Sequence, residues 1–177
     1  MRTGGTLRCV APFRIRVFGD PVLRTPAQEV AVIDDSLRKL ADDMLATMRE
    51  APGVGLAAPQ VGIQKRLFVY DIGEGAHAVV NPQLSGHAGE WDYEEGCLSV
   101  PGLSWSIVRY DEVHLDGWDL DGNAISVDAE ELLARVFQHE CDHLDGVLLI
   151  ERLDKRQRKQ AMRSLRERTL GLPAATP

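Results

Sequence analysis

The stretch Q-H-E-C-D-H, residues 138–143, is the most informative part of this 177-residue sequence. It contains two histidines four positions apart, with a glutamate directly after the first. Positions i and i+4 of a helix lie on one face, so His139 and His143 can bind one metal ion. Glu140 then lies beside that ion, where it can move protons for a water molecule. The stretch therefore predicts a metal-dependent hydrolase built around a helix.

The helix that carries these side chains is predicted to run from Ala129 to Leu144, with Gly146 placed to follow its last turn. Apolar residues one or two turns before His139 supply a hydrophobic flank. A metal-binding pair at the edge of such a flank favours a dry, shaped pocket. These apolar residues are Leu132, Leu133 and Val136.

A third metal ligand must come from elsewhere, and the candidate is Cys97 in the stretch E-G-C-L-S, residues 95–99. One thiolate and two imidazoles fill three tetrahedral positions and leave a fourth for water, which is the arrangement of catalytic sites. Taken alone, Cys97 would more often be an inert buried cysteine. Cys141 lies about 200° around the helix from His139, so it is predicted to pack in the interior.

A third cluster is G-V-G-L-A-A-P-Q, residues 53–60. Its small residues permit close approach of a ligand to the backbone and leave N–H groups free. It is not a phosphate-binding loop, because it lacks the G-K-[ST] ending. Gln60 could donate a side-chain N–H to a developing oxyanion. On its own, however, the segment is more often a structural turn.

The bulk charge argues against indiscriminate nucleic-acid binding. Twenty basic and 27 acidic residues leave a net charge of −7. Residues 151–168 are an exception, with eight Lys or Arg against three acids. Such a segment is usually a solvated helix face.

The cysteine count and the hydropathy bound the location of the protein. Three cysteines, at positions 9, 97 and 141, do not make a disulfide framework and favour a reducing compartment. No apolar run approaches the roughly 18 residues needed to span a membrane. The segment 1–12 has no apolar stretch of signal-peptide length, and a loose tail is favoured over organelle targeting. A cytoplasmic protein is expected.

The remaining patterns predict clustered strands between helices. Two further helices are expected, one over 34–50, capped by Asp35 or Ser36, and one over 154–170. Strands are expected at 15–18, 66–70, 77–80 (ended by Asn81-Pro82), 107–108, 113–115 and 125–127. Strands that cluster rather than alternate with helices indicate an α+β fold with mostly antiparallel pairing. We expect one catalytic domain over 15–170, after an extension at 1–14 and before a tail at 171–177.

The three motifs together resemble those of peptide deformylase, and the resemblance extends from Ile15 to Glu167. It implies that strands wrap around the metal-bearing helix, which would lie between an N-terminal and a C-terminal helix. It also implies roles for particular residues. The metal would be held by Cys97, His139 and His143, the general acid/base would be Glu140, and the formyl oxygen would be held by Gln60 and the backbone N–H of Leu98.

The resemblance implies further contacts around the substrate. Gly55 would pair with the peptide backbone, and Glu95 would form a structural ion pair with Arg109. One loop departs from some members, which carry a basic side chain shortly after the cysteine motif. Here Leu103-Ser104-Trp105 occupies that loop, so contacts beyond methionine are not inferred. The methionine pocket would be lined by Val54, Leu132 and Val136.

The activity implied is removal of the formyl group from the N-terminal methionine of newly synthesised polypeptides, releasing formate, in a bacterial cytoplasm. The resemblance points to Fe²⁺ in the cell, whereas the Cys/His/His set alone also suits Zn²⁺ or another divalent ion. A monomer is expected. The basic helix 154–168 could contact ribosomal RNA through its phosphates, against the usual solvated-face interpretation.

Two other functions remain open from the sequence. A zinc endopeptidase shares the helix motif but takes its third ligand from a downstream His or Glu. No histidine follows His143, although Glu151 remains available. A binding module for nascent chains, without turnover, is the second alternative. Loss of Glu140 or Cys97 would have indicated it, and both are present.

Overall fold

The structure is a computed structural model that describes residues 12–169. Most of the predicted extension 1–14 and all of the predicted tail 171–177 lie outside the described residues. The helices are α1 (Asp35–Glu50), α2 (Glu131–Leu144) and α3 (Lys155–Thr169), with short 3-10 segments η1 (Pro21–Arg24), η2 (Ala58–Val61) and η3 (Leu149–Glu151). The strands are β1 (Gly55–Ala57), β2 (Leu67–Tyr70), β3 (His77–Ala88), β4 (Trp91–Gly96), β5 (Ser104–Arg109), β6 (Glu112–Trp118) and β7 (Ala124–Glu130).

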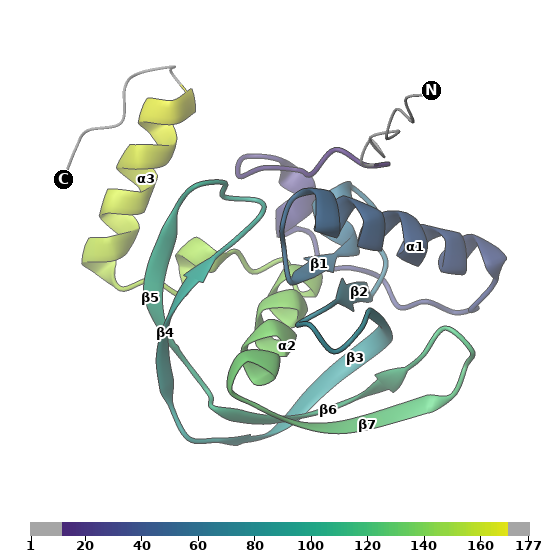
Figure 1. Cartoon of the computed structure of the whole chain (residues 1–177). Helices are drawn as coiled ribbons and strands as arrows, with labels where there is room; N and C mark the ends of the chain where they lie inside the picture. The colour runs from purple at the N-terminus through teal and green to yellow at the C-terminus, as the bar shows by residue number, and fades with distance from the viewer. Residues whose placement is uncertain (1–11, 170–177) are drawn as a thin grey trace, which may run out of the picture.

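The strands form two antiparallel sheets. One has five strands in the order β1-β2-β3-β6-β7, and the other is the β4–β5 hairpin. Helix α2 lies between the hairpin and the larger sheet, with α1 across the β1–β2 end and α3 outside the hairpin (Figure 1). The prediction of an α+β fold with strands around a central helix is confirmed. None of the helices within residues 12–169 is long and apolar enough to cross a membrane.

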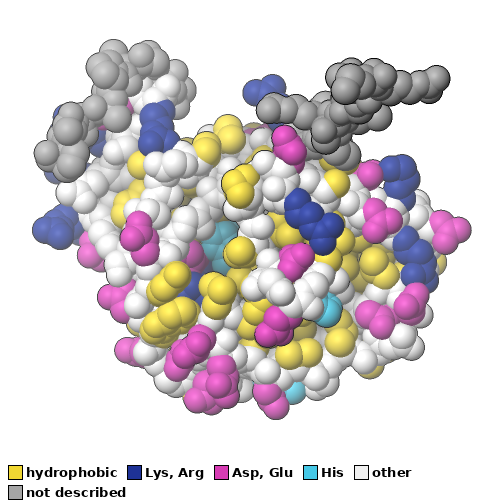
Figure 2. Space-filling view, viewed as in Figure 1, with side chains coloured by type: hydrophobic (Ala, Val, Ile, Leu, Met, Phe, Trp, Pro, Cys, Tyr) yellow, Lys and Arg dark blue, Asp and Glu magenta, His cyan; other side chains and the backbone are white. Residues whose placement is uncertain are grey.

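Charge is unevenly distributed over the molecule. On the face drawn in Figure 2, acidic side chains gather over the lower part, where the sheets lie, and basic side chains stand out near α3. The basic residues of α3 are mostly exposed. The basic segment predicted from the sequence is therefore a helix whose charges reach solvent.

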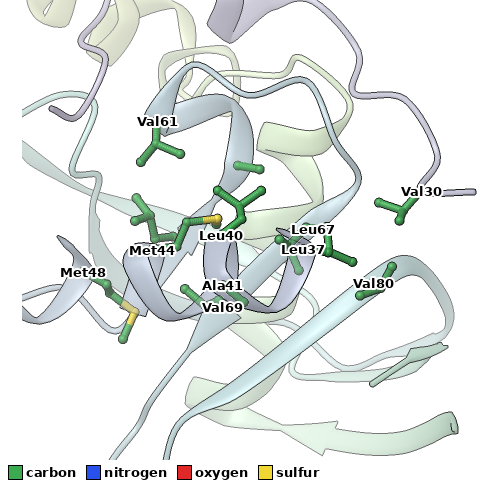
Figure 3. Packing of buried hydrophobic residues seen from close by; sticks show 12 residues of the cluster. Val30, Leu37, Leu40, Ala41, Met44, Met48, Val61, Leu67, Val69 and Val80 are labelled. Atoms are coloured by element: carbon green, nitrogen blue, oxygen red, sulfur yellow. The ribbon is translucent and has the colours of Figure 1, made fainter. Parts of the chain in front are cut away.

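Helix α1 covers one end of the larger sheet. Its apolar residues recur at helical spacing, so they form one buried face. This face packs against β2 and β3, as the sticks in Figure 3 show. Asp34 begins the helix, because its Oδ1 accepts the N–H of Leu37 at 2.9 Å. The cap predicted at Asp35 or Ser36 is wrong by one or two positions.

The buried face of α2 meets the other part of the sheet. Phe137 is fully buried and lies 5.9 Å from Phe68, measured between ring centroids. Cys141 belongs to the same cluster and is 6% exposed, as predicted from its direction on the helix. A fully buried phenylalanine side chain such as that of Phe137 contributes about 1.5–3 kcal/mol. The opposite side of α2 is thereby left to face the β4–β5 hairpin.

Several predicted boundaries are wrong for identifiable reasons. The segment 15–18 forms no strand, because Arg16 N donates to Gln60 O in η2 and Phe18 N to Ser99 O in the loop after β4, and not to one neighbouring strand. Asn81 does not end β3, which continues to Ala88 through a register shift. Asn81 tolerates its φ of +50° at this irregularity.

Other elements begin or end away from the predicted residues. Ala129 and Glu130 belong to β7, because Ala129 pairs with Val113, and α2 starts only at Glu131. Helix α3 begins at Lys155, and the predicted end at Leu170 lies outside the described residues. Strands β1 and β4 are not apparent from the sequence. β4 has mostly exposed side chains, so it lacks a buried alternation.

Candidate active site

Two elements bring three ligand atoms together. His139 and His143 lie one turn apart on α2, and their ring centroids are 4.9 Å apart. Cys97 follows the end of β4, and its Sγ is 3.2 Å from His143 Nε2. One donor atom from each of the three residues lies within 4.8 Å of the others. They form a metal-binding group.

The orientation of His139 is set by a buried carboxylate. His139 Nδ1 lies 2.6 Å from Glu95 Oε1, which leaves Nε2 for the metal side. Arg109 donates to both oxygens of Glu95, at 2.8 and 2.7 Å, and Arg135 Nη1 donates to Oε2 at 2.7 Å. Burial opposes ionisation of Glu95, but the hydrogen bonds from His139 and Arg109 hold its pKa well below the usual range.

The electrostatics of the three donors suit a divalent cation. Burial alone would raise the pKa of the Cys97 thiol, but the adjacent His143 and His139 lower it well below its ordinary value. Ligands bound at 2.0–2.3 Å around one tetrahedral ion are about 3.5 Å apart, close to the Cys97–His143 separation. His143 Nδ1 and Glu140 Oε2 are buried without a hydrogen-bond partner among the described residues. The donor set fits the ion that the sequence predicts.

Glu140 is buried beside this group and against β1. It is 3% exposed, and a Cβ added at Gly55 would lie 2.9 Å from its Cδ. Only a residue without a side chain leaves room for the carboxylate there. Burial raises the pKa of Glu140 to about 7. A carboxyl group of this kind can both accept and return a proton near neutral pH.

Gln60 also lies beside Cys97. Its Oε1 accepts the N–H of Ala57 at 2.8 Å, which orients the amide. Its Nε2 donates to Ser99 Oγ at 3.2 Å and is 3.8 Å from Cys97 Sγ. The neighbouring Leu98 packs against the glycine-rich segment, since a Cβ at Gly53 would lie 2.7 Å from Leu98 Cδ1. Two segments predicted separately from the sequence thus meet at the cysteine.

Most of these residues line one cavity of about 760 Å³. Val54 and Leu132 are partly exposed at its mouth, whereas Gly55 and Val136 are buried. Figure 2 shows a hollow between the hairpin and α1, with a histidine visible inside and hydrophobic side chains around it. His143 and Arg109 do not line it. The residues that line the cavity include Val54, Gly55, Gln60, Glu95, Cys97, Leu98, Leu132, Val136, His139 and Glu140.

The sequence-based reasoning missed Arg135. It lines the same cavity, and besides Glu95 it contacts Ile107 O at 3.1 Å and Trp91 O at 2.6 Å. Its guanidinium also lies 5.0 Å from the Trp91 ring. One signal was available. A charged residue within an otherwise apolar helix flank must find a partner when it is buried.

The alternative third ligand does not reach the metal-binding group. Glu151 pairs instead with Arg24 across the molecule. Among the described residues, Cys97, His139 and His143 are the cluster able to hold a metal ion. The endopeptidase alternative therefore lacks its ligand set.

A buried carboxylate beside a Cys/His/His group, at the bottom of an apolar cavity, defines a metal-dependent hydrolase. Comparisons with known proteins identify which one. The model of the polypeptide deformylase family matches residues 12–159. The chain is 52% identical over 153 residues to the peptide deformylase of Acidothermus cellulolyticus, covering 86% of this chain and 85% of that protein. It is 49% identical over 158 residues to peptide deformylase 1 of Corynebacterium glutamicum, covering 86% and 93%.

Solved structures agree with the sequence comparisons. A peptide deformylase from Legionella pneumophila superposes with a TM-score of 0.84 at 40% identity, over 93% of this chain and 99% of that one. The enzyme from Synechococcus elongatus in complex with actinonin gives 0.85 at 38% identity, over 96% and 95%. The chain belongs to the polypeptide deformylase family. It is an enzyme that removes the N-formyl group from nascent peptides in a metal-dependent reaction.

Proposed function

We propose that Cys97, His139 and His143 hold the metal ion while Glu140 carries the proton for deformylation of N-terminal formyl-methionine. The observation that supports this assignment is the placement of Glu140. Its Oε2 is buried without a hydrogen-bond partner among residues 12–169, and Glu140 lines the cavity together with Cys97 and His139. A buried carboxylate left without a partner is costly unless it has a use.

The chemistry follows from the groups in the cavity. A bound divalent ion supplies a Lewis acid that polarises the formyl carbonyl and lowers the pKa of a water molecule. Glu140 accepts the proton of the attacking water as the new C–O bond forms at the formyl carbon. It then delivers that proton to the amide nitrogen as the C–N bond breaks. The products are formate and a peptide with a free methionine amine.

The developing oxyanion needs donors that are fixed in advance. We assign this role to Gln60 and to the backbone N–H of Leu98. In support, the Gln60 amide is held at its oxygen by Ala57 N and is 1% exposed, so its N–H₂ requires little reorganisation. Both donors lie beside Cys97, where the formyl group would be bound.

The methionine side chain would occupy the apolar part of the cavity. We assign its walls to Val54, Leu132 and Val136, and the backbone contact to Gly55. The unbranched thioether adapts to such irregular apolar space. The hollow on the face drawn in Figure 2 opens to solvent, which supports a route for the rest of the peptide.

Selectivity for the formyl group tests this assignment. The oxyanion donors and the ligands crowd the carbonyl carbon, so a methyl group there should be excluded. Release of formate from formyl-Met-Ala-Ser should exceed release of acetate from acetyl-Met-Ala-Ser by about 10- to 100-fold, as expected when a close-packed site must admit extra volume. Comparable rates on both peptides would indicate a general amidohydrolase.

We propose Fe²⁺ as the ion in the cell, with Zn²⁺ or another divalent ion able to replace it. The thiolate and imidazole donors accept either ion, so affinity alone does not select one. Metal analysis of protein purified without oxygen tests the proposal. Stoichiometric zinc with no iron would contradict it.

We also propose a monomeric cytoplasmic enzyme whose α3 contacts ribosomal RNA. The support is the run of exposed basic residues on that helix, including Arg156, Arg158 and Lys159. Neutralising these three should weaken co-sedimentation with ribosomes and flatten its salt dependence, because fewer counterions are released. Neutralising three basic residues of α1, Arg38, Lys39 and Arg49, is the matched control. Ribosome binding that is unchanged by the α3 substitutions would contradict the contact with ribosomal RNA. The monomeric state is tested separately, by gel filtration.

A further inference from the structure

The loop between β4 and β5 carries both the metal-binding cysteine and a wall of the cavity. It begins at Cys97, and Pro101, Gly102 and Leu103 line the same cavity as the active-site residues. A turn closes its base, where Val100 N donates to Cys97 O at 2.9 Å. The position of the loop tip therefore decides part of the shape of the substrate-binding cavity.

Helix α3 reaches this tip from outside the hairpin. Arg168, in its last turn, donates from Nη1 to the carbonyl of Pro101 and from Nη2 to the carbonyl of Gly102 at 3.0 Å. Earlier in the helix, Gln157 Nε2 donates to Ser106 O of β5 at 3.1 Å. Helix α3 is thus hydrogen-bonded to the hairpin at two points, and the guanidinium of Arg168 contacts the loop.

The backbone at the tip is adapted to this contact. Gly102 has a φ of +69°, a conformation that side chains rarely adopt. A Cβ there would lie 3.3 Å from Arg168 Nη1, so a larger residue would crowd the guanidinium as well as strain the backbone. The turn therefore requires glycine, and glycine is the residue whose backbone has the most conformational freedom when no contact holds it.

We propose that Arg168 is a positioning residue for substrate binding. Its planar fork holds two successive carbonyls and fixes the loop tip, and so keeps the cavity wall at Pro101–Leu103 in the shape that receives the formyl peptide. The terminal helix is then part of the substrate-binding site as well as a charged surface. This inference rests on the proposed function of the cavity.

The test compares Arg168→Ala with Arg166→Ala. Both variants lose one positive charge from the same helix. Arg166 is the control because it is exposed and makes no hydrogen bond or ion pair to other residues in the described part of the chain. For formyl-Met-Ala-Ser, Arg168→Ala should raise KM about three- to tenfold, which corresponds to the net contribution of one typical intramolecular hydrogen bond, with kcat within about twofold. Arg166→Ala should match the wild type. Arg168→Lys should have a KM between those of Arg168→Ala and the wild type, because an ammonium group donates hydrogen bonds but cannot hold both carbonyls as a planar fork does.

A second measurement does not depend on turnover. Hydrogen exchange of the amides over residues 98–103 should be faster in Arg168→Ala than in Arg166→Ala, with β2 and β3 unchanged. Equal KM values and equal loop exchange in the two variants would overturn the inference. If the wild type released no formate from the peptide, the proposed function would fail, while the exchange comparison would still decide whether Arg168 holds the loop.

Discussion

At the residue scale, the active site depends on the close approach of two residues that are 85 positions apart in the sequence, Gly55 and Glu140. Strand β1 presents a glycine to the carboxylate, and α2 presents the carboxylate to the cavity. The absence of a side chain on one residue is therefore as necessary as the acid on the other. Both can be tested by single substitutions.

Glu140→Gln should keep the fold and the metal but lose nearly all turnover. The neutral amide cannot accept the proton of the attacking water. General acid–base assistance contributes about 10²–10⁴-fold, and one group here serves both transfers, so a loss at the upper end is expected. Metal content and formate release are measured on the same preparation. Activity within threefold of wild type would rule out the role assigned to Glu140.

Gly55→Ala should lower kcat at least about tenfold, because its methyl group would occupy the space of the Glu140 carboxylate and displace it by a distance that costs orientation. β1 cannot easily withdraw, since Gly55 pairs with Tyr70 in the sheet. Metal content and the circular dichroism spectrum should match those of the wild type. A normal kcat would show that the carboxylate has room to move.

At the element scale, buried charges fasten the β4–β5 hairpin to α2. Glu95 of β4 meets Arg109 of β5 and Arg135 of α2, and Arg109 continues to Asp142 of α2 at 2.9 Å. Each member is buried, so the loss of one leaves its partners uncompensated. The same carboxylate orients His139, which links hairpin packing to the metal ligand.

Glu95→Gln should therefore reduce both stability and metal retention. Arg135 would then lose its carboxylate partner and Arg109 would keep only Asp142, which should cost about 3–5 kcal/mol of the free energy of unfolding. Urea denaturation and the rate of metal loss to a chelator measure the two effects. Glu94→Gln, an exposed neighbour on the same strand, is the control. Equal denaturation midpoints for the two variants would contradict the role of the charge cluster.

A second element-scale prediction concerns the pairing of β6 with β7. His114 Nδ1 lies 2.6 Å from Asp128 Oδ1, with Asp116 near its other nitrogen, and the hydrogen bond to Asp128 raises the pKa of His114. A raised folded-state pKa gives stability below the ordinary histidine pKa, and this stability is lost as pH rises through the folded value. Wild type should thus melt above His114→Gln at pH 5.5 and match it at pH 9. A difference that grows with pH would contradict this.

At the scale of the whole molecule, the metal joins separate parts of the fold. Its proposed ligands come from α2 and from the loop after β4, which only the folded chain brings together, so the ion should bind the native state more tightly than the unfolded chain. An ion present at 1,000 times its Kd would stabilise the fold by about 4 kcal/mol.

Removing the metal should therefore lower the melting temperature, and restoring Fe²⁺ or Zn²⁺ should recover it. Differential scanning calorimetry before and after chelation measures the change. Cys97→Ser should respond to chelator much less, because a hydroxyl is a poorer ligand than a thiolate for these ions. An identical melting temperature with and without metal would argue against a site that bridges the two parts.

The sequence by itself determined what depends on neighbouring residues. Helical spacing placed His139, Glu140 and His143 on one turn and turned Cys141 toward the interior, because an α-helix advances about 100° per residue. Clustered strand patterns predicted an α+β fold. These properties are local, so motif spacing and apolar periodicity are enough to predict them.

Tertiary structure alone decided which distant residues meet. Strand β4 has mostly exposed side chains and is held by its pairing with β5, so no apolar pattern marks it. Arg135 of α2 donates to Glu95 of β4, and Arg168 of α3 donates to the carbonyl of Pro101. Both hydrogen bonds join elements that are far apart in the chain. Such contacts arise because buried charges and carbonyls must be satisfied by whichever groups packing brings near them. That choice depends on sheet register and helix placement, which no short stretch of sequence contains.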